Sequence, residues 1–249
     1  MPMWPFHVWL PKAHVEAPLG GSLLLAGILL KLGGYQILLY KKELQLMSVK
    51  VCVLMAVLRL GGALYSSCVC LRQIDIKAAI AYSSVCHMGI VGATLAYWHQ
   101  RSGGIALRIM LAHGFISCSL FRIARVLADA VGSRRLLYIR GMSRIYPRVG
   151  GLLLFALALN RGFPLRAGFL SEMFLLTQRV SVKCLILFPQ RLSMVLMGIF
   201  GAHLYLETQH GRPSRATPVV KKVRSREYFL MAVPLVGAVL TITLGDVLF

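Results

Sequence analysis

Apolar stretches long enough to cross a lipid bilayer follow one another along almost the whole chain of 249 residues. A transmembrane helix needs about 20 consecutive, mostly apolar residues. The sequence meets this requirement seven times, at residues 18–40, 51–70, 78–98, 103–128, 149–176, 185–206 and 228–248. We therefore expect an all-α fold, a polytopic transmembrane helix bundle with about seven full spans.

The composition supports a membrane protein and excludes other classes. Only 14% of the residues are charged, whereas 57% are apolar. A soluble domain carries about a quarter charged residues, so an ordinary cytosolic enzyme is excluded. The net charge of +20 resembles that of a nucleic-acid-binding protein. Because such a domain is not apolar throughout, we expect no nucleic-acid partner.

The chain is interpreted as one transmembrane domain over residues 1–249. Residues 1–17 are apolar but too short to span the bilayer, and they are expected to form half of a helix. Pro164 predicts a break in the fifth span, because proline interrupts helix hydrogen bonding. The later parts, in order, are four spans within 18–148, the broken helix and following span in 149–208, a basic loop at 209–227, and the last span at 228–249.

The connecting loops predict how the chain is oriented. If the seven spans alternate, the loops on one side carry six Lys and Arg residues and those on the other side carry thirteen. Lys77 and Arg134 belong to the basic side. Cytoplasmic or matrix loops carry the excess of Lys and Arg in membrane proteins. We expect the basic side to face the cytoplasm or the mitochondrial matrix.

Four ionisable residues lie inside separate predicted spans: Lys31, His87, His113 and Glu172. Charged groups inside a bilayer are costly and mark functional sites. Histidine exchanges protons near neutral pH without perturbation, and burial can bring lysine or glutamate into the same range. The four residues therefore form a plausible proton relay. In the alternative interpretation, each histidine hydrogen-bonds a carbonyl across helices, and Glu172 pairs with Arg166.

Further polar residues lie near these spans. Asp75 and Lys77 come just before the third span, and Arg161 and Arg166 flank Pro164 close to Glu172. Two cations there would hold Glu172 ionised.

We expect no metal site and no cofactor in this chain. The six cysteines lie in apolar segments without zinc-site spacing. His7 and His14 flank a Trp-Leu-Pro segment, but no cysteine or carboxylate stands at a ligand spacing from them. Motifs for hydrolases, zinc proteases and phosphate-binding loops are absent.

Three long segments carry a resemblance to a known family. Residues 7–18, 26–35 and 72–89 resemble the antiporter-like chain 4 family of mitochondrial NADH–ubiquinone oxidoreductase, respiratory complex I. The shorter segments 112–114, 170–172 and 226–228 also fit this family. The resemblance extends from the first residue nearly to the last.

The resemblance implies a fold and a function. It implies the second inverted repeat of an antiporter-like subunit, in which protons move along a mid-membrane polar axis driven by quinone reduction elsewhere in the complex. Lys31 resembles the axis lysine, His87 and His113 the connecting histidines, and Glu172 the exit-side acid.

The resemblance also implies a location and partners. The chain would be a multi-pass protein of the mitochondrial inner membrane and a subunit of proton-translocating NADH:ubiquinone reductase, without redox chemistry of its own. FMN, iron–sulfur clusters and ubiquinone would sit in other subunits. Its partners would be other membrane-arm subunits, including neighbouring antiporter-like chains, and membrane lipids.

Members of this family extend upstream of the position that matches Met1. In that upstream part, a glutamate and a lysine form the input pair of the proton path. Three explanations compete: a separate polypeptide that supplies the amino-terminal half, a truncation, or a reduced, non-pumping structural remnant. We favour the separate polypeptide because the axis residues are kept. A cation/proton antiporter subunit is a further alternative, against which the residues 12–18 argue.

Overall fold

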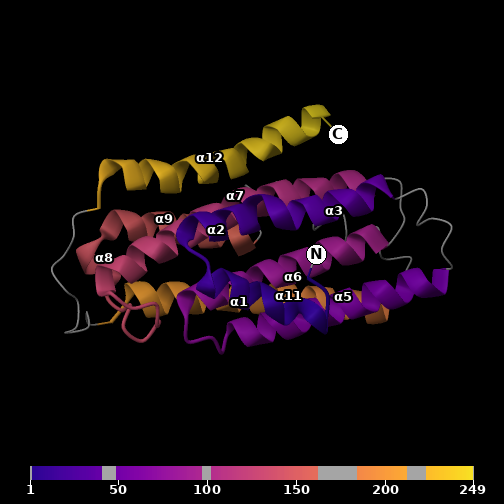
Figure 1. The fold of residues 1–249 in the computed structure, drawn as a ribbon, viewed down its shortest axis with the longest axis horizontal. Helices are drawn as coiled ribbons and strands as arrows, with labels where there is room; N and C mark the ends of the chain where they lie inside the picture. The colour runs from indigo at the N-terminus through magenta and orange to yellow at the C-terminus, as the bar shows by residue number, and fades with distance from the viewer. Residues whose placement is uncertain (1, 41–48, 97–101, 162–183, 212–222, 249) are drawn as a thin grey trace.

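Almost all of the described chain is helical. The structure, a computed structural model, describes residues 2–40, 49–96, 102–161, 184–211 and 223–248. This part contains no strand, and a single isolated bridge joins Asp75 to Arg135. The long helices lie side by side in one elongated bundle (Figure 1). The expected all-α fold is confirmed.

Twelve helical elements are described, two of them a 3-10 helix and a π-helix. In chain order they are the 3-10 helix η1 (Phe6–Val8), α1 (Trp9–Glu16), α2 (Leu19–Leu24), the π-helix η2 (Leu25–Leu29), α3 (Leu30–Leu39), α5 (Val49–Cys70), α6 (Ile76–Ala96), α7 (Ser102–Val131), α8 (Met142–Ile145), α9 (Pro147–Arg161), α11 (Cys184–Gln209) and α12 (Ser225–Leu248).

The first four predicted spans correspond to helices that can cross a membrane. By length and composition, candidate spans cover Leu19–Leu39, Lys50–Cys70, Ile76–Ala96 and Gly103–Val131. The first of these is continuous through α2, η2 and α3. Each matches its predicted span within a few residues at either end.

The last three predicted spans are tested less fully. Helix α9 covers the start of the fifth, but residues 162–183, which include Pro164 and the expected break, lie outside the described residues. Helices α11 and α12 fall on the sixth and seventh. Seven crossings, the inverted repeat and the division into parts therefore remain predictions.

Helix α6 forms the centre of the bundle. It packs against α5 on one side and α7 on the other, while α12 lies along the outer face of α7 (Figure 1). Of its side chains, nearly all from Ile76 to Leu95 are buried. A helix that is apolar all round is expected in such a position. Its polar His87 is therefore held inside the protein.

Proline and glycine set the helix ends that meet at one end of the bundle. Ala17 has extended backbone, with ψ 145°, because the proline that follows disfavours the helical region. Helix α7 ends at Val131, and Gly132, which follows it, has a φ of +75°, the left-handed conformation common after a helix. The amide of Gly132 still donates to the carbonyl of Ala128, at 2.8 Å. The starts of α2 and α6 and the end of α7 lie around one cavity at this end of the bundle.

Candidate functional site

Lys31 emerges from an irregular turn in the first span. The backbone changes from α to π geometry at Leu25–Leu29 and returns to α at Leu30. The ammonium group of Lys31 donates a hydrogen bond to the carbonyl of Ala26, within this turn. Single π turns inside α-helices are frequent at functional sites. The turn therefore supplies a backbone acceptor for a charge inside the membrane.

The second contact of Lys31 is a histidine from another helix. Its Nζ lies 3.1 Å from Nδ1 of His113, which is on α7 and only 1% exposed. This distance is that of a hydrogen bond. The structure thus joins two predicted relay residues that lie 82 positions apart in sequence.

His87 completes the cluster from the central helix. Its side chain is 5% exposed. The centroids of the His87 and His113 rings are 5.3 Å apart, with the ring planes at 50°. Lys31, His113 and His87 therefore come from α3, α7 and α6 to form one chain of ionisable groups, which we call the Lys–His cluster.

Two glycines allow the first span and α7 to approach closely at the cluster. A Cβ on Gly114 would lie 3.3 Å from Cε of Lys31 and 3.4 Å from the carbonyl oxygen of Gly27. A Cβ on Gly27 would lie 3.0 Å from Sγ of Cys118. Small residues at helix contacts in membranes permit this approach. Gly114 is adjacent to His113 in sequence, so the same turn provides both the histidine and the space for Lys31.

An apolar cavity of about 470 Å³ lies beside Lys31, between the first span and α7. Apart from Lys31, it is lined mainly by apolar side chains such as Leu23, Leu111 and Phe115. Charges interact more strongly in such surroundings than in water. Within the described residues, the polar contacts of Lys31 are therefore Nδ1 of His113 and the carbonyl of Ala26.

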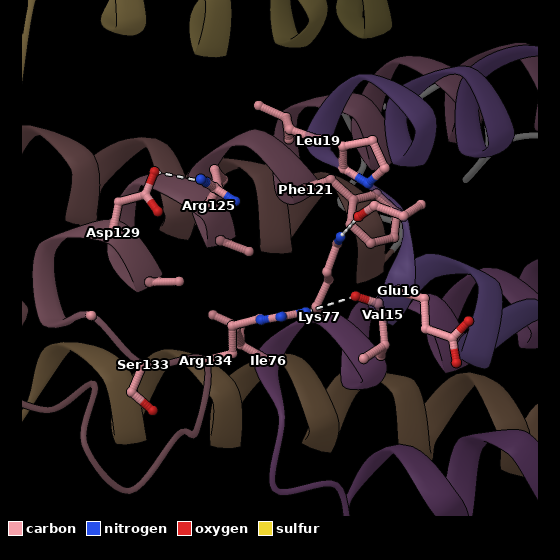
Figure 2. Close-up of a pocket in the computed structure, with 15 residues that line it drawn as sticks. Val15, Glu16, Leu19, Ile76, Lys77, Phe121, Arg125, Asp129, Ser133 and Arg134 are labelled. Carbon is pink, nitrogen blue, oxygen red and sulfur yellow. Dashed lines mark hydrogen bonds and ion pairs between the residues drawn. The ribbon is translucent and has the colours of Figure 1, made fainter.

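Asp75 and Lys77 lie at the end of the bundle where α6 begins, and they bind backbone groups. Nζ of Lys77 donates to the carbonyl of Ala17 at 2.6 Å (Figure 2). The carbonyl of Asp75 accepts from the amide of Ala79 at 3.0 Å, and the residue bridges to Arg135. The Lys77 hydrogen bond and the bridge to Arg135 tie the start of α6 to neighbouring segments.

The exit-side prediction is largely untested. Glu172 and Arg166 lie outside the described residues. Arg161 is the last residue of α9, and its guanidinium lies against Gly201 of α11, where a Cβ would be 2.7 Å from Nε. The role of Arg161 and Arg166 beside Glu172 remains a prediction.

Two buried groups were missed as site candidates by the sequence interpretation. Arg59 lies in the middle of α5, and its guanidinium packs against Gly92 of α6. Its Nη1 is buried and makes no hydrogen bond within the described part of the chain. The sequence feature that could have indicated this contact is the pair Gly89 and Gly92, three residues apart on α6, because small residues allow membrane helices to approach closely.

His14 is the second missed group. Its side chain is fully buried, and its ring stacks on Phe121 with centroids 4.6 Å apart and planes at 15°. From sequence, His7 and His14 were considered only as a metal-binding pair, and no metal site was expected. In the structure, the His7 ring lies against the rings of Tyr65 and Tyr82. Among the described residues, no three His, Cys, Asp or Glu side chains gather to hold a metal ion.

The fold and the Lys–His cluster define a class: polytopic membrane bundles of the antiporter-like type, with ionisable groups gathered between their spans. Sequence comparison then gives the family. The chain belongs to the family described as NADH:quinone oxidoreductase/Mrp antiporter, TM, whose pattern matches residues 1–198.

Relatives in animals carry one name. The chain is 40% identical to NADH-ubiquinone oxidoreductase chain 4 of Ceratitis capitata over 234 residues, 93% of this chain and 52% of the relative. It is 34% identical to the protein of that name from Petromyzon marinus over 242 residues, 97% of this chain and 53% of the relative. The chain thus spans about half the length of these relatives.

Solved structures share the fold. A chain of respiratory complex I from Thermus thermophilus matches with a TM-score of 0.82 at 20% identity, covering 98% of this chain and 52% of that one. A chain of the Mrp complex from Dietzia sp. DQ12-45-1b matches with a TM-score of 0.82 at 15% identity, covering 98% and 53%. At these identities the likeness concerns the fold.

Proposed function

We propose that this chain relays protons across the mitochondrial inner membrane, as a multi-pass subunit of the membrane arm of NADH:ubiquinone oxidoreductase. The observation that supports the proposal is the 3.1 Å contact between Nζ of Lys31 and Nδ1 of His113 inside the bundle. The relatives named NADH-ubiquinone oxidoreductase chain 4 support the choice of this complex.

The proposed step is a proton transfer along the Lys31–His113 hydrogen bond. The ammonium of Lys31 gives one proton to Nδ1 of neutral His113, leaving a neutral amine and an imidazolium. Because imidazole has two ring nitrogens, His113 can release a proton from its other nitrogen. The His87 ring, 5.3 Å away, is the next acceptor, directly or through a water molecule. Glu172 is the proposed exit group.

The other subunits of the complex are the proposed partners. In this proposal the redox chemistry takes place elsewhere, with FMN, iron–sulfur clusters and ubiquinone bound by other subunits. The matched part of the relatives is about half of their length, so the activity of the whole subunit is part of this proposal.

Replacement of Lys31 by alanine tests the relay. In the assembled complex reconstituted in vesicles, Lys31→Ala is expected to lower the number of protons translocated per NADH oxidised. The matched control is Lys12→Ala, which removes an exposed lysine from α1. An unchanged proton-to-electron ratio in Lys31→Ala would refute the role of this lysine.

The same vesicles distinguish two alternatives. A cation/proton antiporter subunit would make proton movement depend on Na⁺ or K⁺, whereas the proposed relay gives the same ratio in either salt. A structural remnant would lose assembly, and not pumping, when the Lys–His cluster is changed. Blue native gels measure assembly for each variant beside the proton-to-electron ratio.

A further inference from the structure

A second polar site lies at the end of the bundle, away from the Lys–His cluster. A cavity of about 440 Å³ is bounded by the start of α2, the start of α6 and the end of α7 (Figure 2). Its lining includes three cations, Lys77, Arg125 and Arg134. From these we infer that the cavity binds the phosphate of an anionic phospholipid.

The cavity lining carries an excess of positive charge. Arg125 forms an ion pair with Asp129, with Nε and Oδ2 2.7 Å apart. Lys77 and Arg134 form no ion pair with any carboxylate of the described chain. Figure 2 shows the side chain of Glu16, the other acid of the lining, pointing away from them. The two remaining cations therefore leave a net positive site.

Both cations are held in place by backbone oxygens. Nζ of Lys77 donates to the carbonyl of Ala17 at 2.6 Å, and Nη1 of Arg134 donates to the carbonyl of Val15 at 2.6 Å. Each contact uses one of several donors, since lysine has three and arginine has five. The remaining donors are free to bind phosphate oxygens, with which both side chains pair well.

The depth of the cavity suits a lipid headgroup. The candidate spans Leu19–Leu39 and Ile76–Ala96 begin beside it, and Gly103–Val131 ends beside it. The cavity therefore lies where the hydrocarbon core meets the headgroup layer. By the predicted alternation of the spans it also lies on the basic side of the loops, which in the proposed function is the matrix side. Basic pockets between membrane helices on that side bind anionic headgroups.

The remaining lining suits the rest of the lipid. Leu19, Phe121, Ala124 and Ala128 provide apolar surface next to the cations. A phosphate bound to Lys77 and Arg134 would thus leave its glycerol and acyl chains against apolar groups. Free inorganic phosphate would use the cations alone, so the two sources of phosphate can be distinguished.

The test is photo-crosslinking in the intact membrane assembly. The assembly is reconstituted in phosphatidylcholine vesicles that contain phosphatidylglycerol with a diazirine near its headgroup. Crosslinked peptides are identified by mass spectrometry. Saturable labelling of peptides that contain residues 15–19 or 124–134 is expected. A phosphatidylcholine probe with the same acyl chains should not label them saturably.

Charge variants measure the contribution of the two cations. A basic residue near the membrane surface contributes enough free energy that removing it weakens anionic lipid binding about fivefold. Lys77→Gln and Arg134→Gln should each raise the half-saturating phosphatidylglycerol concentration about that much. Lys77→Arg and Arg134→Lys, which keep the charge, should retain labelling and control for folding.

Arg72→Gln is the matched control, because Arg72 is exposed in the connection between α5 and α6, on the same side, and does not line the cavity. Equal weakening by Arg72→Gln would mean a diffuse surface potential and would overturn the site. Loss of labelling with millimolar inorganic phosphate, together with phosphate binding in phosphatidylcholine alone, would assign the cavity to free phosphate and overturn the lipid. Unsaturable labelling by the phosphatidylglycerol probe would overturn the lipid site.

Discussion

Replacing Gly114 by alanine should disturb the Lys31–His113 contact without removing either side chain. The new Cβ would stand 3.3 Å from Cε of Lys31, whereas carbon atoms pack best at about 3.5–4.0 Å. Lys31 or α7 must therefore shift by about 0.4 Å. The carbonyl oxygen of Gly27 lies 3.4 Å from the same Cβ, and this backbone atom of the first span cannot easily yield.

The size of the effect follows from this shift. A misplacement of 1 Å at a reacting pair can cost about a hundredfold in rate, so 0.4 Å corresponds to about sixfold. Stability should change little, because overpacking costs about 1–3 kcal/mol while glycine-to-alanine in a helix regains about 1 kcal/mol.

The assay is NADH-driven proton translocation by the assembled complex in vesicles, measured in H₂O and D₂O. Gly114→Ala should slow translocation about sixfold and increase the solvent isotope effect, because the disturbed proton step becomes more rate-limiting. The control is Gly61→Ala in α5, where a Cβ meets nothing within 4 Å. If Gly114→Ala and Gly61→Ala share the wild-type rate and isotope effect, proton transfer does not pass through this contact.

Two further predictions concern the packing that positions the cluster. Gly132→Ala should destabilise the end of α7 by about 1–2 kcal/mol, because a φ of +75° is unfavourable for a residue with a Cβ. Thermal unfolding in detergent measures this loss, and an unchanged unfolding midpoint would contradict the prediction. Gly92→Ala should destabilise by about 1–3 kcal/mol, because its Cβ would collide with the Arg59 side chain. Combining it with Arg59→Ala should remove most of that cost, and strictly additive effects would refute the contact.

Much of the fold could be predicted from sequence, because apolar length alone identifies a membrane helix. The four candidate spans lie where the apolar stretches indicated. Lys31 could be placed in the interior for the same reason, since its neighbours on both sides are apolar and a charge there needs polar contacts.

The contacts within the site could not be predicted in this way. His113 meets Lys31 across 82 residues, and a pairing over that distance depends on how the helices pack. The π turn leaves no mark in Leu25–Leu29, whose residues suit an ordinary helix equally well. Arg59 lies within the predicted second span, but its burial against Gly92 depends on how α5 and α6 pack.

A double-mutant cycle on Lys31 and His113 tests the central claim most directly. The protons translocated per NADH oxidised would be measured for Lys31→Ala, His113→Ala and the double variant. Residues that act as one unit show strongly non-additive losses. The proposed relay predicts that the double variant is no worse than the more impaired single variant. Independent losses that add in the double variant would contradict a shared proton path.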